Sequence, residues 1–217
     1  MTCSPSPRRL RAAWLTFGAA LVLSACALPA SRTAVQQTYR LRAAEVRSAA
    51  LPHPVVLQLL SAEAAPGFGS PAMMYSRQPD LLAPYRDSRW LAAPQRMIDD
   101  AIADTFGRQP WIAGVQRQFT LVRPDFTLQC ALGRLEHDVA ASGGTVRLDL
   151  DCQLVDDASR HIAGRWNLDG AQPIPVNDAA HFAQAAQTLL DRALDRLVAS
   201  TRNAISQAQA QATRASP

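Results

Sequence analysis

Two neighbouring segments in which apolar and polar residues alternate constrain the fold more than any other feature of the sequence. They span residues 126–132 and 146–154, and the turn residues Ser142-Gly143-Gly144 lie between them. A period of two is typical of a strand with one buried and one solvated face, and the turn predicts that the strands pair as a hairpin. We therefore expect an antiparallel sheet with other elements packed on its apolar face. The apolar positions are Phe126, Leu128, Cys130 and Leu132, then Val146, Leu148, Leu150, Cys152 and Leu154.

An export signal at the start of the chain sets the compartment in which this sheet would fold. Three arginines precede an apolar run from Ala12 to Leu23, which is the pattern of a signal peptide. The run is too short to span a membrane, which takes roughly 20 apolar residues. It ends in Leu23-Ser24-Ala25-Cys26, which is similar to the lipobox of bacterial lipoproteins. We expect residues 1–25 to be removed and Cys26 to carry lipid; an ordinary secretory signal is the alternative.

The residues after Cys26 bear on the membrane and on the link to the domain. Lipoproteins held at the inner membrane often carry Asp at the next position, so Ala27 favours the outer membrane. Residues 26–37 are mainly small, polar or proline, and we interpret them as a lipidated tether. Two or more acyl chains would anchor the protein stably, because each buried methylene group contributes about 0.8 kcal/mol.

The charge pattern gives no support for nucleic-acid binding. The chain has 217 residues, of which 22 are basic and 18 acidic. Three of the basic residues lie in the predicted signal, so 19 remain against 18. The sequence contains no basic run or basic face with interleaved aromatic residues, so we set this function aside. The length that remains suits one domain with a full hydrophobic core.

Cys130 and Cys152 are the cysteines that remain once Cys3 is assigned to the signal and Cys26 to the lipid. If the hairpin loop is centred near Ala141, Cys130 lies opposite Cys152 and both side chains point the same way. An exported protein folds in an oxidising compartment, so we predict a disulfide between them. The alternative is two buried thiols that pack as small apolar residues.

Further strands are predicted on both sides of the hairpin. Val55–Leu60 is a continuous apolar run, typical of a strand that is buried on both faces. Residues 66–71 are rich in Pro and Gly and predict a loop. The other predicted strands are Thr38–Val46, Ala72–Arg77, Val115–Val122 and, last in the chain, His161–Leu168, which Pro173 and Pro175 would end.

Two amphipathic helices complete the prediction. The first begins at Pro94, has apolar residues at helical spacing, and ends at Gly107. The second is capped by Asn177-Asp178, and we expect its apolar stripe to pack on the sheet rather than on a membrane or a partner. Residues 206–217 have little to bury and predict a flexible tail. We therefore predict a single α/β (α+β) domain over residues 38–205, with a largely antiparallel sheet. The stripe is Phe182, Ala186, Leu189, Leu190, Ala193, Leu194, Leu197 and Val198.

The sequence contains no convincing catalytic or metal-binding motif. No histidine lies at metal-ligand spacing from another histidine or a cysteine, and no Gly-x-Ser-x-Gly elbow occurs. The carboxylate pairs Asp99/Asp100 and Asp149/Asp151 are best interpreted as solvated charges. We therefore expect no enzyme activity, no cofactor and no metal. The histidines are His53, His137, His161 and His181.

The stretch from Met73 to Phe106 resembles a known family. It combines an apolar strand ending in Tyr75-Ser76-Arg77, then Tyr85, then Arg89-Trp90, a proline, and an amphipathic helix. Together with the lipobox, the Tyr39-Arg40-Leu41 start and the final helix, this pattern is similar to the ABC-type transport auxiliary lipoprotein family. The cysteine pair is not part of that pattern. The resemblance would cover most of the predicted domain.

The resemblance implies a non-enzymatic role beside an ABC permease, its ATPase and an MCE-domain protein in envelope lipid transport. The lipoprotein would sit on the periplasmic face of the outer membrane, dock the MCE assembly and possess a distinctive partner-binding surface. We assign that surface to Tyr75, Arg77, Tyr85, Arg89 and Trp90, because Tyr, Trp and Arg are enriched in interfaces. The alternative is that Tyr85 and Trp90 only fix the loop to the sheet. A phospholipid ligand and a homo-oligomer are left open.

Two rival functions have the same anchor and domain. One is an outer-membrane lipoprotein that regulates a cell-wall enzyme or another envelope partner. The other is a periplasmic hydrolase, which predicts a pocket with convergent titratable groups and shifted pKa values.

Overall fold

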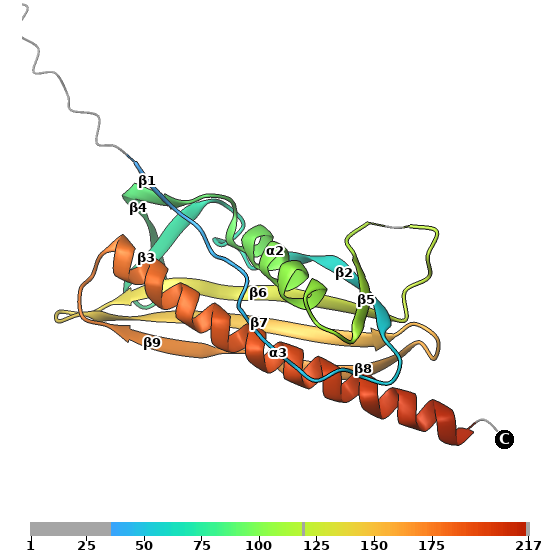
Figure 1. Cartoon of the computed structure of the whole chain (residues 1–217). Coiled ribbons are helices and arrows are strands. Elements are labelled where there is room, and N and C mark those ends of the chain that lie inside the picture. The colour runs from blue at the N-terminus through green and yellow to red at the C-terminus, as the bar shows by residue number, and fades with distance from the viewer. Residues whose placement is uncertain (1–35, 119, 216–217) are drawn as a thin grey trace, which may run out of the picture. The chain divides into compact units, whose positions relative to one another are not determined.

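The predicted hairpin forms the centre of the sheet in the computed structural model, which describes residues 36–118 and 120–215 (Figure 1). The leader, Ser24, Ala25 and Cys26 lie outside the described residues. The strands are β1 (Gln37–Tyr39), β2 (Val55–Ala64), β3 (Ala72–Gln78), β4 (Leu81–Trp90), β5 (Ile112–Gln116), β6 (Phe126–Val139), β7 (Gly144–Asp156), β8 (His161–Asn167) and β9 (Gly170–Ile174). The helices are α2 (Pro94–Gly107) and α3 (Ala179–Ala215).

The β6–β7 hairpin organises all the other strands into one mixed sheet. On one side of β6, β2 pairs with its first half and β3 with its second half, both in parallel. β5 continues the sheet from β2, while β4 and β1 continue it from β3. On the far side, β8 and β9 pair with opposite halves of β7. The α+β class is confirmed; the longest ladder is antiparallel, but β1, β2 and β3 add parallel pairings.

The predicted register of the hairpin is confirmed. Cys130 lies opposite Cys152, and the two form a disulfide with Cα atoms 4.1 Å apart. An irregularity at Gly133 then shifts the pairing by one residue, so that Arg134 lies opposite Asp149. The shift changes which positions face the core: Leu135 and His137 are buried there, and Glu136 and Asp138 alternate with them.

Both helices cover the same face of the sheet (Figure 1). The apolar residues of α2 and the whole predicted stripe of α3 are buried, which confirms that the stripe packs on the sheet. Asp178 caps α3 by accepting a hydrogen bond from the backbone N–H of His181 at 2.8 Å. The opposite face of the sheet carries no helix among the described residues, and we call it the open face. Neither described helix has the length and hydropathy needed for a membrane span.

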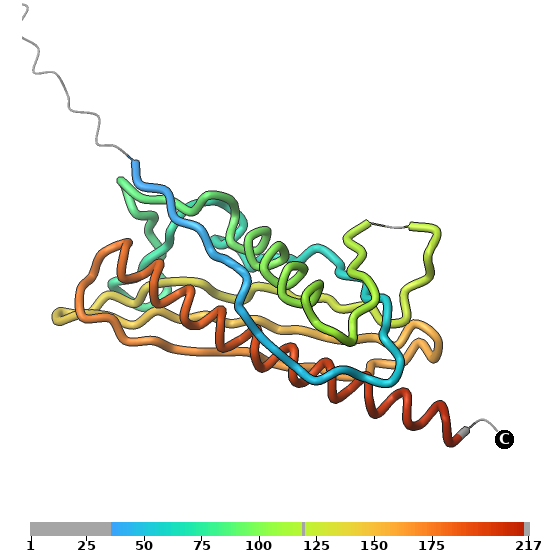
Figure 2. Tube along the Cα trace, in the orientation of Figure 1, coloured from blue at the N-terminus to red at the C-terminus, as the bar shows by residue number. Residues whose placement is uncertain are grey.

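The strand predicted over Thr38–Val46 is wrong after Tyr39. From Arg40 the chain runs as an extended segment beside both helices (Figure 2). Helix side chains, rather than a neighbouring strand, satisfy its backbone: Gln187 bonds the N–H and carbonyl of Arg42, and Gln109 donates to the carbonyl of Val46. Leu41 and Ala44, three residues apart, are buried in this segment, a spacing that differs from the period of two in a strand.

Two other strand predictions need correction. The predicted strand Val115–Val122 is instead β5, which ends at Gln116; beyond it Leu121 and Val122 are exposed and have no strand neighbour. His161–Leu168 is not the last strand, because β9 follows it. Pro173 does not end the sheet but lies inside β9, where it is tolerated because an edge strand needs only one row of hydrogen bonds.

The flexible tail predicted for 206–217 is wrong for the residues that the structure describes. Helix α3 continues to Ala215. Ala208 packs against the core, and the Gln209 amide donates to the carbonyl of His53 at 2.8 Å. The extended segment before β2 provides these contacts, and the sequence alone did not place that segment beside α3.

Candidate functional site

The five residues predicted to form a partner-binding surface do not lie on one surface. Trp90 is fully buried, and its indole packs edge-on against Phe182 of α3 at a centroid distance of 5.4 Å. Its assignment to a binding surface is therefore wrong. Trp90 joins the end of β4 to the first turn of α3. Its role is structural, as in the alternative left open by the sequence, but its partner is α3 and not the loop.

Tyr85 belongs to a hydrogen-bonded network on the helix-covered face. Its hydroxyl is 2.8 Å from Nδ1 of His137, whose Nε2 is 3.0 Å from the side-chain oxygen of Asn177. The Asn177 amide donates to the carbonyl of Ala140, so its oxygen accepts from His137 Nε2–H. In the neutral form of His137, which its lowered pKa favours, Nδ1 accepts from the Tyr85 hydroxyl. Burial lowers the pKa of His137 and, with the charge of Asp178, raises that of Tyr85 to about 12.

Tyr75, Arg77 and Arg89 lie at the border of this network. Tyr75 packs edge-on against Tyr85 and is partly exposed, and Arg77 lies over the Tyr75 ring at 5.5 Å. Arg89 is exposed elsewhere on β4. Of the five predicted residues, only Arg77 lines a pocket of the open face that lies beside the β3–β4 turn.

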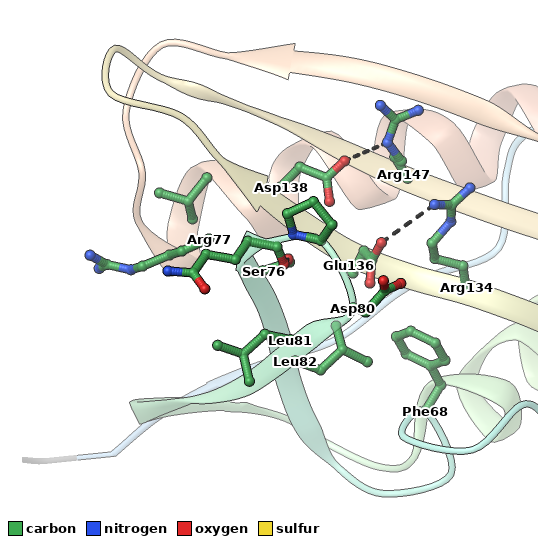
Figure 3. Close-up of a pocket in the computed structure, with 13 residues that line it drawn as sticks. Phe68, Ser76, Arg77, Asp80, Leu81, Leu82, Arg134, Glu136, Asp138 and Arg147 are labelled. Carbon is green, nitrogen blue, oxygen red and sulfur yellow. Dashed lines mark hydrogen bonds and ion pairs between the residues drawn. The ribbon is translucent and has the colours of Figure 1, made fainter.

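This open-face pocket lies between the β3–β4 turn and strands β6 and β7, and its volume is about 640 Å³. One wall is apolar and comes from Phe68, Leu81 and Leu82, and the floor is charged (Figure 3). Leu81 is 57% exposed although it is a large apolar residue. An exposed leucine beside a few converging charged groups is an arrangement typical of binding sites. The charged lining residues are Arg77, Asp80, Arg134, Glu136, Asp138 and Arg147.

Ion pairs across the β6–β7 hairpin build the charged floor. Arg134 contacts Asp149 at 2.8 Å and Glu136 at 3.5 Å, and Arg147 pairs with Asp138. Alternate positions on paired strands share one face, so the register of the hairpin brings these side chains together on the open face.

Glu136 is the most buried charged group of the pocket, at 9% exposure. Its burial raises the pKa of its carboxyl group, and the neighbouring charge of Asp138 adds to the increase. Arg134 opposes the shift without cancelling it. The carboxyl group of Glu136 therefore has a raised pKa even though it pairs with Arg134.

The network around His137 supports the floor from the other side of β6. His137 lies between Glu136 and Asp138 in the strand, so fixing its ring fixes the backbone that presents both carboxylates. Gly144 allows this close packing, because a Cβ at that position would come within 2.4 Å of His137 Nε2. The pocket thus rests on a closely packed, hydrogen-bonded part of the hairpin.

Sequence reasoning missed Asp80, Leu81, Leu82 and most of the charged floor. One signal was available: Arg134, Glu136 and Asp138 alternate on one strand, opposite Arg147 and Asp149 on its partner. Only Asp149 and Asp151 were considered, as solvated charges. Asp149 pairs with Arg134 instead, while Asp151 is exposed and accepts from Asn167. The shift at Gly133 decides the face of Glu136, and the isolated glycine inside the strand was a signal for it that was not used.

The pocket meets part of the expectation for a hydrolase, since titratable groups converge and the pKa of Glu136 is raised. The arrangement of its other groups is less favourable to catalysis. Ser76 donates its hydroxyl to the carbonyl of Gln78 at 2.6 Å, and Arg134 and Arg147 are held in ion pairs. No histidine lines the pocket. Among the described residues, no three His, Cys, Asp or Glu side chains form a metal-binding group.

Solved structures with the same fold define the structural class. Protein XCC0632 from Xanthomonas campestris is 22% identical, with a TM-score of 0.69; the match covers 82% of this chain and 99% of that one. A second structure, described as an uncharacterized protein, is 9% identical with a TM-score of 0.57, covering 76% and 99%. At these identities the likeness establishes the fold alone. No curated protein matches the chain significantly.

Residues 39–198 match the model of the family described as the ABC-type transport auxiliary lipoprotein component. The match covers most of the chain, and the protein therefore belongs to this family. The family resemblance predicted from the sequence is confirmed. By its description, the family consists of lipoproteins associated with ABC-type transport systems.

Proposed function

We propose that this protein is a non-catalytic lipoprotein that docks the periplasmic MCE assembly of an ABC-type lipid transport system at the outer membrane. The family match over residues 39–198 carries this proposal. It supplies the association with ABC-type transport, and the open-face pocket supplies a surface on which a partner can dock.

The contrast between the two faces of the sheet supports docking at the open face. The helix-covered face is filled by buried apolar residues, and the pocket offers Leu81, Leu82 and a set of charges to the surroundings. Specific interfaces combine an apolar centre with charged groups that fix register and partner choice. Arg77 at the border is the predicted partner-binding residue that this location retains.

The anchor in this proposal is lipid on Cys26. Ten residues separate Cys26 from Gln37, where β1 begins, and an extended chain of that length reaches roughly 35 Å. The domain would therefore stay close to the membrane while keeping freedom to orient its open face. Labelled fatty acid should appear on the protein and be absent from Cys26→Ala. An unlabelled wild-type protein would contradict the anchor.

Co-purification from the native envelope tests the docking surface. Leu81→Ser should reduce recovery of MCE-domain and ABC-transporter subunits by about tenfold, because a truncated apolar anchor commonly costs 1–2 kcal/mol of binding. Leu91→Ser is the matched control, since Leu91 is also 57% exposed but lies outside the pocket. Equal recovery with both variants would contradict docking at the pocket. Recovery of a cell-wall enzyme in place of transport subunits would support the rival function.

A further inference from the structure

We propose that Arg40 and Arg42 bind anionic phospholipid headgroups and hold the β1 end of the domain against the membrane that carries the lipid anchor. This inference rests on the anchor at Cys26 in the proposed function and adds a second contact to it. Three features of the chain carry it: the distribution of charge along the sequence, the free state of the two guanidinium groups, and their distance from the anchor.

Positive charge is concentrated in the part of the chain that follows Cys26 most closely. Residues 26–44 contain three arginines and no acid, and Glu45 is the first acid after Cys26. Of the 22 basic residues, three lie in the predicted leader and three in this segment, so 16 remain in residues 45–217 against 18 acids. An anionic membrane surface would therefore attract the start of the domain and not the remainder.

The guanidinium groups of Arg40 and Arg42 are available to a ligand, since both residues are exposed. In the part of the chain that the structure describes, neither group forms an ion pair. The hydrogen bonds between Arg42 and Gln187 involve only the backbone of Arg42. Arg134 and Arg147 of the open face, by contrast, are held by carboxylates. Binding of phosphate by Arg40 and Arg42 would therefore break no existing ion pair.

The helix surface beside these arginines does not repel an anion. Arg40 and Arg42 line a groove together with the first turns of α3. Residues 179–190 of that helix contain no acid. The acids that flank this stretch, Asp178 and Asp191, each accept a hydrogen bond from the helix itself. A headgroup phosphate near Arg40 and Arg42 would therefore meet uncharged helix residues.

Arg89 adds positive charge at the same end of the domain. It is exposed and lies opposite Thr38 in the ladder between β1 and β4. Asp87, the acid nearest to it in β4, pairs with Arg86. Figure 1 shows that β1 lies at the opposite end of the domain from the C-terminal end of α3. The end of the domain at which the described chain begins is thus its basic end.

The anchor keeps this basic end within reach of the headgroups. Ten residues separate Cys26 from Gln37, so β1 begins at most roughly 35 Å from the lipidated residue. The attraction of an arginine to an anionic surface falls off within a Debye length, which is about 8 Å at physiological salt. The tether alone sets only a maximal distance. Contact of Arg40 and Arg42 with headgroups would restrict the domain to orientations in which β1 meets the membrane.

Proximity favours a membrane surface over an acidic protein partner. Whenever the protein is anchored, headgroups are present at high local concentration beside β1, whereas a partner must first be recruited. One arginine near an anionic surface shifts the bound population by about fivefold, so two can set the orientation of a domain that the acyl chains already retain. An acyl anchor and a basic patch act together in this way because neither has to bind tightly alone.

Energy transfer to lipid headgroups in reconstituted vesicles tests the contact. With Cys26 lipidated and Cys130 bonded to Cys152, Thr38→Cys supplies the only free thiol for a fluorescent donor. The acceptor is a lipid with a rhodamine headgroup. Transfer should be greater in vesicles that contain about one-third phosphatidylglycerol than in pure phosphatidylcholine. The difference should disappear at about 1 M salt, where the Debye length is about 3 Å.

A second label and matched variants locate the contact. A donor on Ser159→Cys, in the exposed turn between β7 and β8, should show no increase with phosphatidylglycerol. Arg40→Gln combined with Arg42→Gln should reduce the increase at position 38 by at least about threefold. Arg123→Gln combined with Arg165→Gln is the control: both arginines are exposed, lie before β6 and in β8, and remove the same charge. This control pair should leave the increase unchanged.

The inference is overturned if transfer from position 38 is equal in the two kinds of vesicle, if salt leaves the difference unchanged, or if the control pair reduces it as much as Arg40→Gln with Arg42→Gln. The salt titration needs no arginine variant, so it decides the question even if a variant misfolds. Failure of the proposed function is distinguishable. A protein that does not float with either kind of vesicle would refute the anchor, whereas retention without dependence on phosphatidylglycerol would remove only the contact. Lipid-dependent transfer without recovery of transport subunits would keep the contact and remove the docking function.

Discussion

The two faces of the sheet differ in the side chains that they carry, although the same strands form both. On the helix-covered face, side chains are apolar and buried, and His137 there has both ring nitrogens hydrogen-bonded. On the open face, its neighbour Glu136 is also buried but lies among charged groups: it pairs with Arg134, while burial and the charge of Asp138 raise the pKa of its carboxyl group. Adjacent residues of β6 thus lie in an apolar and in a charged environment. The helix-covered face accounts for stability, and our proposed function assigns recognition to the open face.

The largest effect should come from the helix-covered face. Trp90→Ala should lower the free energy of unfolding by about 3–5 kcal/mol, because the indole is fully buried and contacts Phe182. Urea denaturation measures the loss. Trp90→Phe is the control and should cost less, since it keeps the aromatic contact and removes an indole N–H that has no partner among the described residues. A Trp90→Ala protein of wild-type stability that loses its partner would reverse the assignment of the two faces.

The disulfide should give the next largest effect. Cys130→Ala combined with Cys152→Ala should lower the free energy of unfolding by about 2–4 kcal/mol, because the bond restricts the unfolded chain. Reduction of the wild-type protein should produce a similar loss in the same denaturation experiment. If reduction left the free energy of unfolding unchanged, the disulfide would not contribute to the stability of the helix-covered face.

A smaller effect on the free energy of unfolding should depend on pH. It should come from His137 on the helix-covered face and differ in sign from any effect of Glu136 on the open face. The native state lowers the pKa of His137, so the unfolded chain takes up a proton more readily once pH falls below about 6.5. Stability should therefore be complete above this pH and decrease as pH falls from 6.5 toward the native pKa of His137. Denaturation curves between pH 7.5 and about 5 measure the slope.

The control for this slope is His137→Gln, which removes the titrating group. The variant should lose part of the decrease in stability over that pH range. Glu136 cannot produce the same slope: its pKa is raised, so its contribution to stability is lost as pH rises. An unchanged slope in His137→Gln would show that the network is not the source.

The smallest effect on stability is expected from Leu81→Ser. Leu81 is 57% exposed, so the free energy of unfolding should change by no more than about 0.5 kcal/mol. Urea denaturation of Leu81→Ser and Leu91→Ser side by side checks this expectation. A loss of several kcal/mol would mean that Leu81 supports the fold, and partner loss in this variant could then not be assigned to docking.

The sequence predicted the elements whose pattern is local. The β6–β7 register, the Cys130–Cys152 pair and both helix starts follow from periodicity and caps, because these signals depend on neighbouring residues. The extended segment from Arg40 and the continuation of α3 to Ala215 were missed for a common reason. Each is stabilised by contact with the other, across more than 140 residues of sequence.

The candidate site was less predictable than the fold. Trp90 was assigned to a surface because its residue type is frequent in interfaces, whereas its burial depends on Phe182 of the distant α3. Asp80 and Glu136 line the same pocket only because β3 pairs with β6, a long-range parallel pairing. Arg77, which was chosen for its residue type, lines the pocket because it lies next to the β3–β4 turn, and its role in partner binding stays a prediction.

Site-specific photo-crosslinking in the native envelope tests the central claim most directly. A photoreactive residue in place of Leu81 should form a crosslink to an MCE-domain protein or another subunit of an ABC transport system, identified by mass spectrometry. The same residue in place of the equally exposed Leu91 should form little or none of that product. Crosslinks of equal yield at the two positions, or products at Leu81 that contain no transport subunit, would contradict the assignment of recognition to the open face.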